Sequence, residues 1–132
     1  MTPVRDRSRR SRSVVLAAIA LIAVAVLSGC QTAGTGIGTP PPGAIVVSAN
    51  YSVFEQASVQ APANQAFTIW FENRENVPHN VRVVQGTGAN VALGQIFNGP
   101  AAQPLNVPSI APATYKLRCD VHPDMLAELV AN

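Results

Sequence analysis

Residues 115–125 read YKLRCDVHPDM, and the fold of the chain is best inferred from this segment. In its first half, Tyr115, Leu117 and Cys119 alternate with two cationic side chains, so the three share one face of an extended backbone. Alternation with period two is typical of a β-strand that buries one face. We therefore expect a strand that ends at Cys119, with the thiol pointing into the protein.

Beyond residue 30 the chain has one thiol, two imidazoles and one thioether, on Cys119, His79, His122 and Met125. Sulfur ligands suit Cu(I), and two His with one Cys and a weak Met form the blue-copper type of site. Zinc is the competing metal, but structural zinc sites use Cys and His rather than Met. Taken singly, each residue has an ordinary explanation: a surface histidine, a buried cysteine or a core methionine. A disulfide between Cys119 and Cys30 is a further alternative. Together they predict one copper ion.

The spacing of these residues resembles that of the cupredoxins, and most closely the amicyanin-type small blue copper proteins. Residues 77–81, VPHNV, resemble the family's first-ligand segment. Residues 115–125 resemble its C-terminal ligand loop, with Cys-x-x-His-x-x-Met and a Pro after the His. The resemblance implies an all-β fold over residues 44–132, a Greek-key sandwich or barrel of the cupredoxin type.

The same resemblance implies a role for each donor. His79, Cys119 and His122 are then the equatorial ligands of the copper, and Met125 is the axial ligand. Asn80 is then the residue that ties the two ligand loops together.

The chain also departs from the family pattern. Asp120 stands where relatives often have a Ser or Thr that hydrogen-bonds to the Asn, and it adds charge beside the site. Asp124 lies next to a histidine that emerges through an apolar patch in relatives. Ala127 and Ala113 replace two common glycines. None of these changes removes a ligand.

Short β-like runs bounded by Pro, Gly and Asn fill the rest of the domain, which favours a sandwich or barrel. The clearest of them occupy residues 45–47, 67–71 and 81–83. Residues 86–112 are rich in Gly, Asn, Ala and Pro, and we expect a long loop there with room for one short strand. Residues 124–131 fit a helix by propensity and a strand by alternation. Because the family's last strand follows the Met ligand, we expect a strand over residues 127–130.

The first thirty residues have the pattern of an export signal. Five Arg lie within residues 5–12, and an uncharged apolar run follows at residues 14–27. Such a run is short for a membrane-spanning helix, which needs about 20 residues, although an uncleaved anchor remains the alternative. Residues 27–30, LSGC, resemble the bacterial lipobox. That resemblance implies cleavage before Cys30 and lipidation of its thiol.

These features predict three parts: a lipoprotein signal peptide at 1–29, a lipidated Cys30 with a flexible Gly/Thr/Pro tether at 30–43, and a cupredoxin-like domain at 44–132. We expect an exported protein, lipid-anchored on the extracytoplasmic or periplasmic face of a membrane. After residue 29 the chain has four Lys and Arg against six Asp and Glu, a net charge of −2. Nothing in that balance favours nucleic-acid binding.

We expect a monomeric electron carrier that passes single electrons from a donor redox protein to an acceptor. His122 is the expected exit route, because relatives expose the edge of this ring. A copper storage or delivery protein of the cell envelope is the alternative, since the same ligands serve both. An oxidase or nitrite reductase needs further histidine-rich copper centres, and the chain has only two His, so we expect no enzyme. A metal-free binding module is disfavoured because all four ligands are present.

Overall fold

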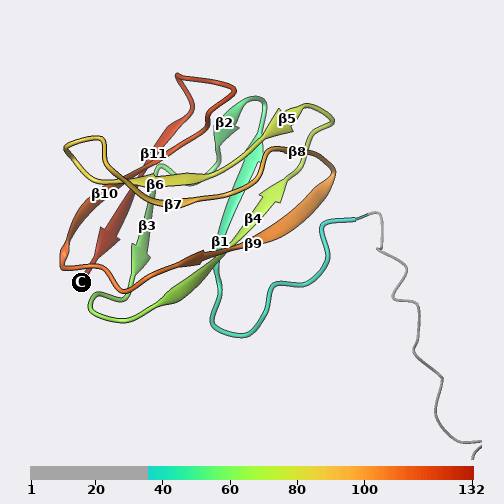
Figure 1. Ribbon diagram of the computed structural model, residues 1–132. Helices are drawn as coiled ribbons and strands as arrows, with labels where there is room; N and C mark the ends of the chain where they lie inside the picture. The colour runs from blue at the N-terminus through green and yellow to red at the C-terminus, as the bar shows by residue number, and fades with distance from the viewer. Residues whose placement is uncertain (1–35) are drawn as a thin grey trace, which may run out of the picture. The chain divides into compact units, whose positions relative to one another are not determined.

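The computed structural model describes residues 36–132 (Figure 1). The expected signal peptide, Cys30 and the first part of the tether lie outside the described residues. Within the described part all regular structure is β-strand, as predicted, and no helix there is long and apolar enough to cross a membrane. The strands are β1 (Ile45–Asn50), β2 (Val53–Phe54), β3 (Ser58–Ala61), β4 (Phe67–Asn73), β5 (Pro78–His79), β6 (Arg82–Val84), β7 (Asn90–Leu93), β8 (Phe97–Asn98), β9 (Ala101–Val107), β10 (Ala113–Arg118) and β11 (Leu126–Ala131).

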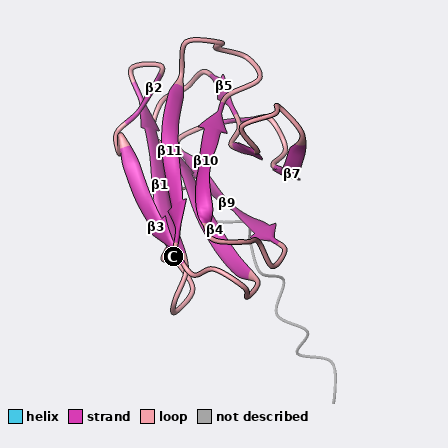
Figure 2. Ribbon diagram, turned by 90° about the vertical axis from the view of Figure 1, so that its left-hand side faces the viewer, coloured by secondary structure: helices cyan, strands magenta, loops and turns pink. Residues whose placement is uncertain are grey.

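Two sheets form the layers of a sandwich (Figures 1 and 2). One has the strand order β2-β1-β4-β9, with β1 parallel to β4 and β9 antiparallel along the other side of β4. The other has the order β3-β11-β10-β6-β7, in which β11 is parallel to β3 and antiparallel to β10. The short strands β5 and β8 form a separate antiparallel pair.

The hydrophobic core lies between the two sheets. Val47, Ile69 and Phe71 enter it from the four-stranded sheet, and Leu117 and Leu129 enter it from the five-stranded sheet. All five side chains are fully buried or nearly so. Burial of one such side chain contributes about 1.5–3 kcal/mol to folding, so this core is what holds the layers together.

Strand β10 has the alternation predicted from its sequence. Tyr115, Leu117 and Cys119 are 3%, 0% and 2% exposed, whereas Lys116 and Arg118 face solvent. The chain therefore delivers the thiol to the interior, at the end of the strand where the next loop begins. The strand predicted over residues 127–130 is also confirmed, as part of β11.

The prediction of a long loop over residues 86–112 is wrong, because β7, β8 and the seven-residue β9 all lie there. The sequence of β9, AAQPLNV, contains few good strand formers. It nevertheless pairs with β4 along its whole length, from Val107 opposite Phe67 to Ala101 opposite Asn73. β9 lies at the edge of its sheet, where a proline such as Pro104 is tolerated. Pairing with β4, rather than local propensity, makes this segment a strand.

Candidate metal centre

The first histidine is positioned by the turn that follows β4. Asn73, the last residue of β4, is fully buried, and its side-chain amide donates to the carbonyl oxygens of Val77 at 2.7 Å and Phe97 at 2.9 Å. His79 then pairs with Phe97 in the β5–β8 ladder. These contacts hold the turn against β8 and bring the imidazole of His79 to a fully buried position.

The other donors lie in the loop that joins β10 to β11. The backbone N–H of Cys119 donates to the carbonyl oxygen of Met125 at 3.2 Å, and the N–H of Met125 donates to the carbonyl oxygen of His122 at 3.0 Å. The loop is thereby closed onto itself. Cys119 and Met125 are buried, and His122 is partly exposed.

The fold brings three donor atoms from these two loops together. The Nδ1 atoms of His79 and His122 are 3.1 Å apart, and the Sγ of Cys119 lies 3.7 Å from the first and 3.9 Å from the second. The two rings have centroids 4.5 Å apart at an angle of 44°. This cluster joins positions about forty residues apart in the sequence.

The cluster has the dimensions and the chemistry that a transition metal needs. Imidazole nitrogen and thiolate sulfur bind such metals at ~2.0–2.3 Å, so two ligands of one ion lie at most about 4.6 Å apart. All three separations are within that limit. Two nitrogen donors and one sulfur donor, with a methionine buried on the same loop, fit copper by donor type.

Asn80 and Asp120 join the two loops next to the donors. The backbone N–H of Asp120 donates to the Oδ1 of Asn80 at 2.8 Å, and the Nδ2 of Asn80 donates back to the Oδ2 of Asp120 at 2.7 Å. The Nδ2 of Asn80 also donates to the carbonyl oxygen of Gly94 at 3.1 Å. Asn80 is almost completely buried, so these bonds fix the spacing between His79 and Cys119.

Glu75 is a residue of this site that sequence reasoning missed. Its Oε1 lies 2.8 Å from the Nε2 of His79, on the opposite side of the ring from the donor atom, and accepts the backbone N–H of Ser52 at 2.6 Å. The hydrogen bond from Ser52 lowers the pKa of Glu75, and contact with His79 lowers it further, against the opposing effect of burial. A carboxylate behind a metal-binding histidine orients the ring and selects its tautomer. The only sequence signal was an acid four positions before the histidine.

Comparisons with known proteins agree with this fold. The family model for the cupredoxin-like domain matches residues 17–131. A structure of a reduced amicyanin variant is 27% identical and covers 70% of this chain and 86% of its own, with a TM-score of 0.56. Auracyanin A of Chloroflexus aurantiacus, described as a "blue" copper protein, is 21% identical over 67% of this chain and 98% of its own, with a TM-score of 0.59.

Auracyanin of Roseiflexus castenholzii has the same fold at 16% identity, over 74% of this chain and 99% of its own, with a TM-score of 0.60. No curated protein matches the sequence. The family model spans most of the chain, including every residue of the two ligand loops. The chain belongs to the cupredoxin-like family.

Proposed function

We propose that this protein is a membrane-tethered type 1 blue copper protein that carries single electrons between redox partners. His79, Cys119 and His122 hold the copper, and Met125 is the weak axial ligand. The observation that carries the proposal is the triad itself, two imidazole nitrogens and one thiol sulfur all within 4.8 Å of one another. The bound copper supplies a reversible one-electron couple.

The surroundings of the donors favour electron transfer, because rapid transfer requires a site whose geometry changes little. His79 is held by the β5–β8 pair and by Glu75, and Cys119 is held by its backbone bond to Met125. Asn80 prevents the two loops from separating. The similar protein amicyanin has been described in both a reduced and an oxidised state.

His122 is the expected contact point for the partners. It is the one donor of the triad that is partly exposed, whereas His79 and Cys119 are buried. An electron that leaves through the His122 ring crosses the shortest distance to the surface. Both histidines of the chain belong to this site, so the sequence offers no imidazoles for a second copper centre.

The tether belongs to the same proposal. Cleavage before Cys30 and lipidation of its thiol would anchor the domain on the extracytoplasmic face of a membrane, within reach of membrane-bound redox proteins. The support is the LSGC sequence at the end of the apolar run. Metabolic labelling with a fatty acid tests it: labelled protein is expected from the natural chain and none from Cys30→Ser.

The test of the copper site is an absorption spectrum. The fragment from Gln31 onward, loaded with one equivalent of Cu(II), is expected to show an intense visible thiolate-to-copper band, and Cys119→Ser is expected to lose it. A colourless Cu(II) protein refutes the blue-site proposal. Reversible oxidation in voltammetry is the expected result for a carrier. Rapid loss of copper to a chelator without such a wave would indicate copper delivery instead.

A further inference from the structure

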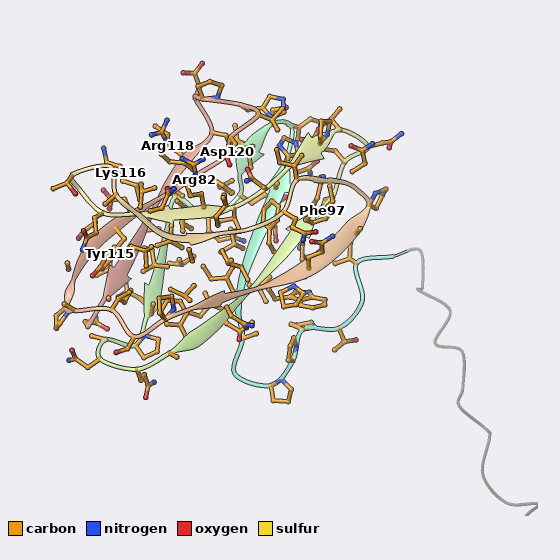
Figure 3. All side chains as sticks on the ribbon, in the orientation of Figure 1. Arg82, Phe97, Tyr115, Lys116, Arg118 and Asp120 are labelled. Atoms are coloured by element: carbon orange, nitrogen blue, oxygen red, sulfur yellow. The ribbon has the colours of Figure 1, made fainter. Side chains whose placement is uncertain are left out.

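An ion pair connects strand β6 to the Cys119 loop. The Nη2 of Arg82 contacts the Oδ1 of Asp120, and both side chains are about a quarter exposed, at 27% and 26%. The two residues lie together with Arg118 over strands β6 and β10 (Figure 3). Asp120 directly follows Cys119, so the guanidinium contacts the residue next to the thiol donor.

The carboxylate of Asp120 is held on both of its oxygens. Its Oδ1 forms an ion pair with the guanidinium of Arg82, and its Oδ2 accepts a hydrogen bond from the Nδ2 of Asn80 at 2.7 Å. Asn80 and Arg82 are two residues apart on one short segment of chain, directly after His79. The segment that carries His79 therefore contacts the Asp120 carboxylate twice, through Asn80 and through Arg82.

The charges around Asp120 make Arg82 its specific partner. Arg118 lies directly opposite Arg82 in the β6–β10 register, and like charges in that position repel. None of the ion pairs among residues 36–132 involves Arg118, although Asp120 is its second neighbour in the chain. Asp124, the other acid of the loop, is exposed and belongs to none of these pairs either.

We propose that Arg82 is a positioning residue of the metal site: its guanidinium holds the Asp120 carboxylate against Asn80 and so keeps the Cys119 loop in register with His79. This inference rests on the copper site proposed above. A carboxylate at position 120 brings a negative charge next to a thiolate, and Arg82 offsets that charge while it fixes the side chain. Arg82 and Asp120 thus act as one unit.

The hydrogen bonding of Arg82 argues against a purely structural role. Its Nε is buried and has no hydrogen-bond partner among the described residues. An unpaired buried donor destabilises a fold, so the guanidinium is not placed for the best possible stability. Replacement of Arg82 by Met removes that unpaired donor together with the ion pair. Its effect should therefore appear in the site more than in global unfolding.

The experiment compares four forms of the full chain, purified in detergent: natural, Arg82→Met, Arg118→Met, and Arg82→Met combined with Asp120→Ser. Arg118→Met is the matched control, because it removes the same charge from the same face without breaking an ion pair. The first readout is the rate at which a chelator removes Cu(I). The second is the exchange rate of the backbone N–H at position 120 in the metal-free protein.

Arg82→Met is expected to release copper about tenfold to a hundredfold faster, the range typical for loss of a residue that supports a metal ligand. The Asp120 N–H is expected to exchange faster in the same variant, because the carboxylate no longer holds the loop against Asn80. Arg118→Met should stay within about twofold of the natural chain in both readouts. The double variant should return toward natural values, because a serine hydroxyl at position 120 can still hydrogen-bond to Asn80 and carries no charge that needs Arg82 beside it.

Two results overturn the proposal: equal effects of Arg82→Met and Arg118→Met, or a double variant as impaired as Arg82→Met alone. If Arg82→Met does not fold, the double variant decides, since the proposal requires it to fold and to bind copper. Failure of the copper assignment is distinguishable. A natural chain without a blue band refutes that assignment. Amide exchange in the metal-free protein still shows whether Arg82 holds the Asp120 loop in place.

Discussion

Replacement of Glu75 by Gln tests whether one carboxylate organises the buried half of the metal site. The side chain receives a hydrogen bond from the N–H of Ser52 at 2.6 Å and contacts the Nε2 of His79 at 2.8 Å, and it is 22% exposed. Gln keeps the shape and one oxygen acceptor but loses the charge. The substitution therefore isolates the electrostatic part of both contacts.

The expected loss follows from the two contacts. A hydrogen bond to a charged group contributes about 1.5–3 kcal/mol to stability, and a neutral one about 0.5–1.5 kcal/mol. The difference is roughly 1 kcal/mol for each contact, or up to about 2 kcal/mol for both at pH 7. Partial exposure of the carboxylate brings the expected loss to about 1–2 kcal/mol, because solvent screens the charge.

The sign of the pH dependence follows from the lowered pKa of Glu75, whose first cause is the hydrogen bond from Ser52. A carboxylate with a depressed folded-state pKa stabilises the protein above its unfolded-state pKa, and this contribution disappears as the pH falls through the folded-state value. The stability gap between the natural chain and Glu75→Gln should therefore be full at pH 7 and narrow in acid, below the ordinary pKa of a glutamate.

Urea unfolding of the metal-free protein, at pH 7 and at a pH below the ordinary pKa of a glutamate, measures the difference in unfolding free energy between the natural chain and Glu75→Gln. Glu128→Gln is the control, because Glu128 is exposed on β11 and forms no ion pair among the described residues. Equal losses for the two variants at pH 7, or a gap that widens in acid, would refute the reasoning.

Three further variants probe the framework of the fold. Tyr51 and Ser52 form a two-residue hairpin turn with φ of +53° and +57°, where Asn-Gly is preferred, so Tyr51→Asn with Ser52→Gly should raise the free energy of unfolding by about 1 kcal/mol, measured in urea. Leu129→Ala should lower it by about 2–5 kcal/mol in the same assay, because the side chain is fully buried in the core. Gly99→Ala should destabilise the protein and weaken the blue band, because its Cβ would meet the carbonyl oxygen of Asn73 at a distance no real contact allows. An unchanged spectrum and unfolding curve for Gly99→Ala would show that the turn before His79 can shift without cost.

The parts of the site that could be predicted depend on local patterns. The inward direction of Cys119 follows from the alternation that begins at Tyr115, a pattern that depends on local backbone geometry alone. The set of metal donors could also be predicted, because the chain has only two His, two Cys and two Met from which a soft-metal site could be built. The structure places His79 and His122 beside that thiol.

The parts that could not be predicted depend on pairing across the fold. Strand β9 forms because β4 offers it a partner, and its own composition with Pro104 indicates a loop. Glu75 reaches His79 because of the path of one turn, and Arg82 reaches Asp120 because β6 lies beside β10. Acidic and cationic residues occur on any protein surface, so the sequence alone does not distinguish these from their neighbours.

The interior position of β11 has a consequence for how the protein is made. This strand lies between β3 and β10, and it also forms the far side of the loop that holds Cys119 and His122. Until residues 126–131 have been synthesised, β3 has no partner in the five-stranded sheet and the loop has no second strand to close it. Pairing between segments so distant in sequence is slow to form. The five-stranded sheet and the loop that carries Cys119 and His122 can therefore close only after residues 126–131 have been synthesised, whereas every strand of the four-stranded sheet lies within residues 45–107.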